Sequence, residues 1–105
     1  MCQLRILGRQ GSSCAMECVH CSNVYLFYKE VLLILSYSEL EIFQQNLRDI
    51  DFWLYCQLTV DGQSRMTISS PKPDIHYHLN ETEFEDLRSA LHEAVCMREV
   101  YEMLD

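Results

Sequence analysis

Cysteines are the residues of this chain with the clearest chemical potential. Four of the six lie within the first 21 residues: Cys2, Cys14, Cys18 and Cys21. Two thiolates spaced as in Cys18-x-x-Cys21 can bind one tetrahedral Zn²⁺ at Zn–S distances of about 2.3 Å. Cys14, Cys2 or His20 would complete the site. A zinc ribbon has a second Cys-x-x-Cys, which this chain lacks. We therefore keep two alternatives: a zinc ion on Cys14, Cys18, Cys21 and Cys2, or a loop of unliganded thiols.

Two catalytic interpretations of the same cysteines are weaker. The spacing from Cys14 through Cys18 to Cys21 matches the iron–sulfur motif of radical S-adenosylmethionine enzymes, but too few residues follow for their barrel. A dithiol at Cys18 and Cys21 would suit a thiol–disulfide oxidoreductase, in which a helix N-terminus stabilises the thiolate. A strand hairpin is expected after Cys21 instead. The sequence thus favours a non-enzyme, and the oxidoreductase is the alternative function.

The other candidate ligands have simpler explanations. His76 and His78 are two residues apart on an expected strand and therefore share a face, where they could chelate a metal. The solvated face of a strand explains them as well, because Tyr77 between them is expected to point inward. Cys56 and Cys96 lie in apolar patterns, where a free cysteine behaves as a small hydrophobic residue.

Composition excludes several classes of protein. The chain has 105 residues and a net charge of −8, and its eight basic residues form no cluster. Nucleic acids and anionic membrane surfaces are bound through clustered Lys and Arg, so neither is an expected partner. The most apolar stretch, residues 24–37, contains Lys29 and Glu30 and is shorter than a membrane span. With no visible signal peptide, we expect one cytoplasmic domain, residues 1–105, with reduced thiols.

The elements that would position these residues repeat along the chain. A shift of 44 residues superimposes Ser36 and Glu39 on Asn80 and Glu83. Each pair has the spacing of a capping box, in which the first side chain and the acid three residues later bond the free N–H groups of a helix start. Apolar residues then follow with helical spacing: Leu40, Phe43, Leu47 and Ile50 in the first copy, and Phe84, Leu87, Leu91 and Ala94 in the second.

Extended segments precede both expected helices. Residues 24–28 and 31–35 predict one strand pair, and residues 66–69 and 75–79 predict another. Residues 52–60 resemble a further strand, Asp61-Gly62 predicts a hairpin turn into residues 63–69, and residues 3–7 would add an edge strand. The expected fold class is α+β: an antiparallel sheet of about five or six strands with two helices on one face, and an internal β-β-α duplication.

The residues from Cys18-Val19-His20-Cys21 onward resemble a family of small uncharacterised bacterial proteins. In that family a Cys-x-x-Cys precedes a strand, a turn, a second strand and an acid-capped helix. Here the turn falls at Tyr28-Lys29-Glu30-Val31, and the next strand and helix carry Leu33, Leu35, Ser36, Glu39 and Phe43. Lys29-Glu30 replaces the Gly-Asn expected at the turn. The resemblance covers residues 18–105, with residues 84–104 as its closing helix, and it implies the fold but no activity.

Residues 31–35 are apolar at every position, as are residues 52–56. A sheet covered by helices on one face normally shows polar residues on the other. Another surface must therefore cover the second face, either the N-terminal segment or a partner chain, and a homodimer is the expected form. The sequence as a whole predicts a non-catalytic protein that self-associates or binds a protein partner, either with a structural zinc or with no cofactor.

Overall fold

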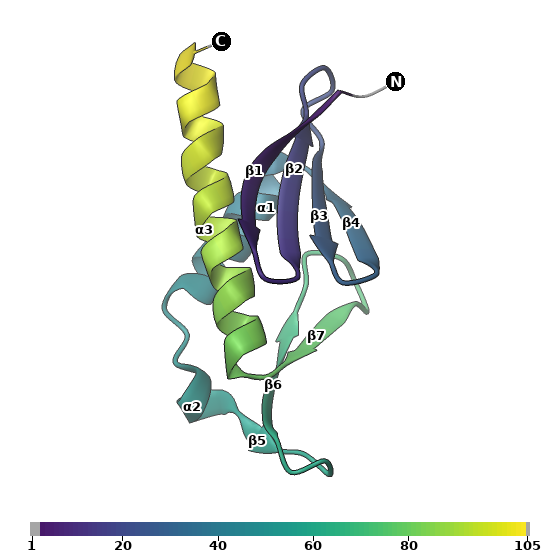
Figure 1. Ribbon diagram of the computed structural model, residues 1–105, viewed down its shortest axis with the longest axis vertical. Coiled ribbons are helices and arrows are strands. Elements are labelled where there is room, and N and C mark those ends of the chain that lie inside the picture. The colour runs from purple at the N-terminus through teal and green to yellow at the C-terminus, as the bar shows by residue number, and fades with distance from the viewer. Residues whose placement is uncertain (1–2, 105) are drawn as a thin grey trace.

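Two antiparallel sheets and two long helices make up the chain in the computed structural model, which describes residues 3–104 (Figure 1). Four strands in chain order form the first sheet: β1 (Leu4–Gln10), β2 (Ser13–Cys18), β3 (Val24–Tyr28) and β4 (Val31–Leu35). The helix α1 (Tyr37–Arg48) and the single turn α2 (Phe52–Tyr55) follow. The second sheet contains β5 (Gln57–Leu58), β6 (Ser64–Ser69) and β7 (His76–Leu79), and α3 (Glu81–Leu104) closes the chain.

The predicted α+β class with antiparallel strands is confirmed, but the strands divide into sheets of four and three. The long helix α3 packs along β1 and β2 and against α1, while α1 contacts β4 (Figure 1). One apolar core joins both sheets to these helices. It includes Leu26 and Leu35 of the first sheet, Tyr77 and Leu79 of the second, and Leu40 and Phe84 of the helices.

Both predicted capping boxes are present. The N–H of Glu39 donates to Oγ of Ser36 (3.1 Å), and the N–H of Ser36 donates to the Glu39 carboxylate (2.9 Å). At α3 the N–H of Glu83 donates to Oδ1 of Asn80, and the N–H of Asn80 donates to the Glu83 carboxylate, each at 2.9 Å. Each box satisfies two N–H groups that a helix start leaves unpaired, which explains why both helices begin where the sequence predicts.

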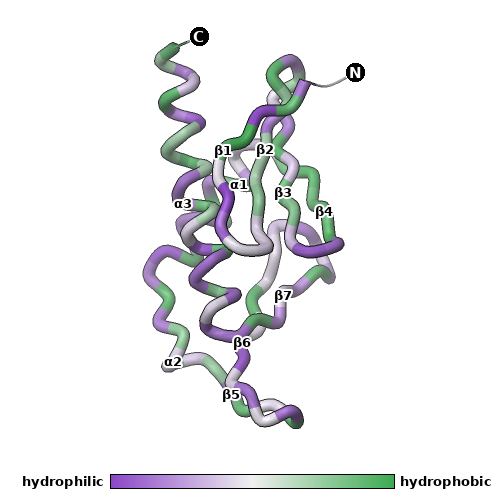
Figure 2. The backbone as a smooth tube through the Cα atoms, viewed as in Figure 1, coloured by the Kyte–Doolittle hydropathy of each residue, from purple (hydrophilic) through white to green (hydrophobic). Residues whose placement is uncertain are grey.

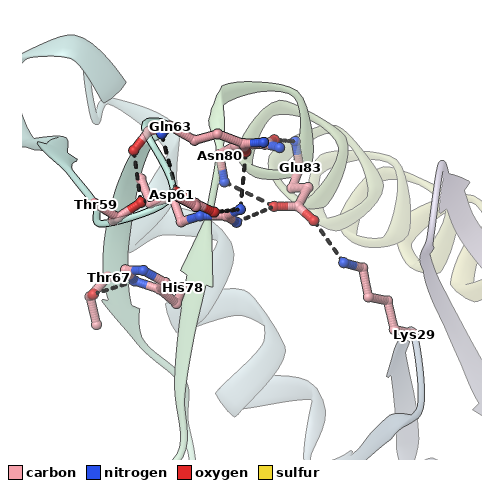
Figure 3. Close-up of polar contacts among 9 residues, drawn as sticks. Lys29, Thr59, Asp61, Gln63, Thr67, His78, Asn80 and Glu83 are labelled. Carbon is pink, nitrogen blue, oxygen red and sulfur yellow. Dashed lines mark hydrogen bonds and ion pairs between the residues drawn. The ribbon is translucent and has the colours of Figure 1, made fainter.

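The hairpin of β3 and β4 also matches its prediction, and Lys29-Glu30 forms its turn. Lys29 adopts a left-handed backbone conformation with φ of 53°. Glycine or asparagine adopts this conformation at lower cost, so Lys29 occupies a strained turn position. An ion pair compensates in part, because Nζ of Lys29 lies 2.8 Å from the carboxylate of Glu83 (Figure 3).

Glu83 also connects the two sheets. Besides Lys29 in the β3–β4 turn, its carboxylate lies 3.7 Å from the guanidinium of Arg65 in β6. Arg65 in turn pairs with Asp61 in the β5–β6 turn at 2.9 Å. Burial raises the pKa of Glu83, but the hydrogen bonds from Lys29 and from the N–H of Asn80 outweigh it and hold the pKa below its ordinary value.

The prediction of a strand over residues 52–60 is wrong for its first half. Asp51 caps the short helix α2 there by accepting a hydrogen bond from the N–H of Trp53 (3.0 Å). Only Phe52 is buried in α2, while Trp53, Leu54 and Tyr55 are exposed. The aromatic residues suggested a strand, but the N-cap decides the local structure. The Asp61-Gly62 turn into β6 is confirmed, although β5 before it has only two residues.

β2 was not predicted, and it carries two of the candidate cysteines, Cys14 and Cys18. On the other face of this strand, Ser13, Ala15 and Glu17 point toward the helices and are buried. Small and charged residues on a buried face conceal the apolar alternation by which a strand is recognised. The expected edge strand over residues 3–7 is β1, which extends to Gln10.

The internal duplication stays a hypothesis. Both proposed copies have a strand hairpin followed by a capped helix. Their hairpins differ, since two residues separate β3 from β4 while residues 70–75 separate β6 from β7. A shared origin is not needed to explain two capping boxes.

None of the helices within residues 3–104 has the length and apolar character of a membrane span.

Candidate functional site

The surface of the four-stranded sheet that faces away from the helices is the candidate site. Backbone pairing aligns its side chains in two rows that cross all four strands. We call these eight residues the outer face: Ile6, Met16, Tyr25 and Ile34 in the first row, and Arg9, Cys14, Phe27 and Leu32 in the second.

Apolar side chains at both edges of the outer face are open to solvent. Ile6 is 48% exposed in β1, and Leu32 and Ile34 are 44% and 49% exposed in β4. The side chains of β2 and β3 between them are partly buried. Among the eight residues Arg9 alone is charged. The outer face is therefore a contiguous apolar surface, and Figure 2 shows the hydrophobic character along β3 and β4.

The alternation within β4 explains how this face arises. Leu33 and Leu35 point into the core and are 3% and 1% exposed, while Leu32 and Ile34 point outward. This confirms the prediction that the strand is apolar on both faces. The contributions of β1 and β2 were missed, because residues 13–18 were not recognised as a strand. The signal available for them was the alternation of Cys14 and Met16 with smaller or polar neighbours.

The four cysteines predicted to bind zinc do not all meet. Cys14 and Cys18 lie four residues apart on β2, about 13 Å in an extended strand, which is too far for one tetrahedral ion. Cys21 lies in the exposed turn after β2, and Cys2 lies outside the described residues. Within residues 3–104, no three His, Cys, Asp or Glu side chains are grouped so that they could hold a metal. A zinc site on Cys18, Cys21 and Cys2 stays a prediction.

The surroundings of Cys18 and Cys21 differ from those of a thioredoxin-like dithiol. The N–H of Cys18 donates to the carbonyl of Asn23 (2.9 Å), and the N–H of Ser22 donates to the carbonyl of Cys18 (3.0 Å). This tight turn leads into the strand β3, not into a helix. In such enzymes a helix follows the dithiol, and its N-terminus stabilises the thiolate; here a strand follows Cys21. Cys18 is also only 1% exposed.

His76 and His78 share the exposed face of β7, as predicted. Oγ1 of Thr67 lies 3.0 Å from Nδ1 of His78 (Figure 3), and Oγ of Ser69 lies 3.4 Å from Nδ1 of His76. Each imidazole thus pairs with a hydroxyl across the strands. The described residues place no third metal ligand beside these two.

Cys56 and Cys96 were both expected to act as small hydrophobic residues. Cys56 is partly buried and packs against the core. For Cys96 the expectation is wrong: it is exposed on α3, with its Sγ 3.8 Å from Nε2 of His92 one helical turn earlier. At this level the opposite face of α3 packs on the sheet, with Ala94 fully buried and Arg98 paired with Glu17 of β2, so Cys96 lies on the solvent side of the helix.

The chain belongs to a family of unknown function (DUF6686), which matches residues 1–105. The predicted resemblance to a family without assigned activity is therefore confirmed, and the match includes β1 and most of β2, which precede the Cys-x-x-Cys. No curated protein and no solved structure matches the chain.

Proposed function

We propose that this chain is a non-catalytic binding module that pairs with a second copy of itself through the outer face. The observation that carries the proposal is the exposure of Ile6 at one edge of the sheet and of Leu32 and Ile34 at the other, joined across β2 and β3 by partly buried side chains, while the opposite face of the sheet packs on the core. Single exposed apolar residues are ordinary, but contiguous apolar patches commonly mark contact surfaces.

Sheet geometry favours a partner with the same shape. Two sheets stack face to face about 10 Å apart, with side chains from both inner faces filling the space. Two copies related by a twofold axis would place the same rows of side chains against each other, which is the commonest arrangement of homodimers. The half-buried aromatic rings of Tyr25 and Phe27 would lie at the centre of such a contact.

The charge distribution supports the same surface. A net charge of −8 opposes the approach of two copies. The outer face has no acidic residue, and its one charged side chain, Arg9, lies at the edge strand β1. A contact centred on β3 and β4 therefore keeps carboxylates out of the interface.

A zinc ion on the cysteines would have a structural role in this module. Cys18 and Cys21 bracket the turn between β2 and β3, so a metal there would fix one end of the outer face. Metal analysis of the purified protein tests this part. The expected result is a single zinc per chain that is lost in Cys21→Ser and kept in Cys96→Ser.

Light scattering coupled to size exclusion tests the pairing. We expect twice the mass of one chain for the wild type and a single-chain mass for Ile34→Asp, which puts a carboxylate at the centre of the exposed edge. Leu58→Asp is the matched control, because Leu58 is 75% exposed in β5, outside the outer face, and this variant should remain paired. A single-chain mass for the wild type at high protein concentration would overturn the proposal.

A further inference from the structure

One edge of β6 has unpaired backbone groups. β7 pairs with β6 over Met66–Ser69, but on its other edge β5 pairs only with Ser64 and Arg65. The N–H of Ser70 donates to the carbonyl of Ile75 (3.0 Å), so Ser70 directs its backbone groups toward β7. In an antiparallel pair successive residues point their N–H and C=O groups to opposite edges. Thr67 and Ser69 therefore direct these groups away from β7.

β5 begins opposite Arg65, so it does not cover the edge of β6 at Thr67 and Ser69. Among residues 3–104, the N–H groups of Thr67 and Ser69 donate no hydrogen bond; only their side-chain hydroxyls have partners. An open strand edge of this kind is a template for an added strand. The edge is short and its side chains are polar, so it attracts a chain through the backbone rather than through apolar contact alone.

A groove of about 800 Å³ runs beside this edge. All four residues of Met66–Ser69 line it. Because alternate side chains of a strand point to opposite faces, a groove that touches consecutive residues must follow the edge of the strand. The opposite wall comes from the C-terminal half of α1 and the loop after it, which supply Gln45, Asn46, Leu47, Asp49 and Ile50, and Tyr55 adds an aromatic ring.

The hollow continues toward the N-terminal half of α1. A smaller space of about 110 Å³ shares Asn46 and Ser69 with the groove and is lined further by Ile42 and Pro71. Ile42 is 57% exposed there. The α1 residues of this wall follow helical spacing, so one face of the helix runs alongside β6. The wall of α1 and the edge of β6 together have the shape of a channel for one extended chain.

We propose that this groove binds an extended peptide segment of another protein, which adds as a strand to the Thr67–Ser69 edge of β6. Main-chain hydrogen bonds would give the affinity, and the side chains along α1 would select the sequence. The groove between β6 and α1 takes one strand, so a second folded copy, whose edge strand would bring the next strand of its own sheet with it, does not fit. The proposal goes beyond the pairing through the outer face, which lies on the other sheet.

Charge and polarity define the chemistry of the peptide. Asp49 is the charged residue of the larger groove, and the whole chain has a net charge of −8. An acidic peptide is therefore disfavoured, and a basic side chain near Asp49 is favoured. Leu47, Ile50 and Tyr55 favour apolar side chains at alternate positions, whereas Gln45 and Asn46 can hydrogen-bond the free edge of the added strand.

Selection of random seven-residue peptides displayed on phage, against the immobilised wild-type protein, provides the probe. We expect enriched peptides with alternating apolar residues and a Lys or Arg. Binding of the synthetic peptides should weaken at least about tenfold in Thr67→Pro, which removes an N–H at the open edge and is tolerated because that N–H takes no part in pairing with β7. Thr67→Ala keeps the N–H, so it should weaken binding far less than Thr67→Pro does.

A second measurement does not depend on how well the proline variant folds. N-methylation of alternate peptide amides should abolish binding to the wild-type protein for one set of positions and spare it for the other, since only one edge of an added strand faces β6. Peptides that bind equally to Thr67→Pro and Thr67→Ala, tolerance of N-methylation at every position, or the absence of any enriched peptide would each overturn the proposal. Slow amide exchange of Thr67 and Ser69 in the free protein would also overturn it, because the edge would then already be occupied.

Discussion

Gly8 of β1 lies against the backbone of Ala94 in α3, so close that a Cβ atom on Gly8 would come within 2.9 Å of the Ala94 nitrogen. The carbonyl oxygen of Ala90 would be closer still. The pairing of β1 with β2 shifts register between Ile6 and Gly8, and this bulge turns the strand where it meets the helix. Gly8 thus sets the distance between α3 and the four-stranded sheet.

Gly8→Ala should destabilise the protein by about 2–3 kcal/mol, because the added methyl group must push backbone atoms that cannot rotate away. Urea unfolding followed by circular dichroism measures this loss. The control is Gly62→Ala, where a Cβ meets nothing within 4 Å and only the positive φ of 81° is unfavourable. It should lose about 1 kcal/mol. Equal losses for both variants would show that crowding by α3 is unimportant.

Glu17 is a buried carboxylate held by two arginines. It is 2% exposed on β2, with Arg5 of β1 2.7 Å away and Arg98 of α3 2.8 Å away. Glu17→Gln removes the buried charge that both guanidinium groups share and should lower the free energy of unfolding by about 3 kcal/mol. Glu102→Gln is the matched control: Glu102 pairs with Arg98 at 2.6 Å but is 58% exposed, so its loss should be below about 1 kcal/mol. Similar losses for the two variants would contradict a special role for burial.

Local signals account for the parts of the fold that the sequence predicts. The Ser36–Glu39 and Asn80–Glu83 boxes involve residues three apart, so both helix starts can be recognised without knowing the tertiary structure. The hairpin of β3 and β4 is likewise local, because continuous apolar residues flank a two-residue turn. The unbroken run of apolar residues in β4 also indicated that this strand has an apolar face outside the core.

Long-range contacts explain the parts that the sequence does not predict. β2 has Glu17 on its buried face, where Arg5 of β1 and Arg98 from the far end of the chain compensate its charge. The groove beside β6 depends on how α1 packs next to a strand some twenty residues later, which no sequence pattern records. Cys14 and Cys18 similarly appear close in sequence, but an extended strand separates them.

Burial should separate the cysteines by reactivity in the native protein. Cys96 is exposed on α3, so a thiol reagent should modify it within the time of mixing, whereas Cys18 is 1% exposed and should react only when the protein opens. Mass spectrometry of peptides from a timed alkylation measures both rates separately from that of Cys21, which is also exposed. Rapid modification of Cys18 together with reduction of insulin by the native protein would favour the oxidoreductase instead.

The β5–β6 turn should make stability depend on acid pH. The pKa of Asp61 is lowered from 3.8 to about 2, first because the Thr59 hydroxyl donates a hydrogen bond to its carboxylate, and further by the N–H of Gln63 and by Arg65. A carboxyl group with a lowered pKa stabilises the folded state above its unfolded pKa and loses this effect as the pH falls through the folded value.

The stabilisation from Asp61 should therefore be complete above pH 3.8 and disappear as the pH approaches 2. Asp61→Asn removes the charge, so the difference in melting temperature between the wild type and this variant should be constant near neutral pH and shrink over that acid range. Asp74→Asn, in the β6–β7 loop, is a control for the general effect of removing one surface charge. A carbon-detected NMR titration of the Asp61 carboxyl group gives the midpoint directly. A midpoint near 3.8, or a melting-temperature difference that does not change between neutral pH and pH 2, would show that these hydrogen bonds do not hold the charged form.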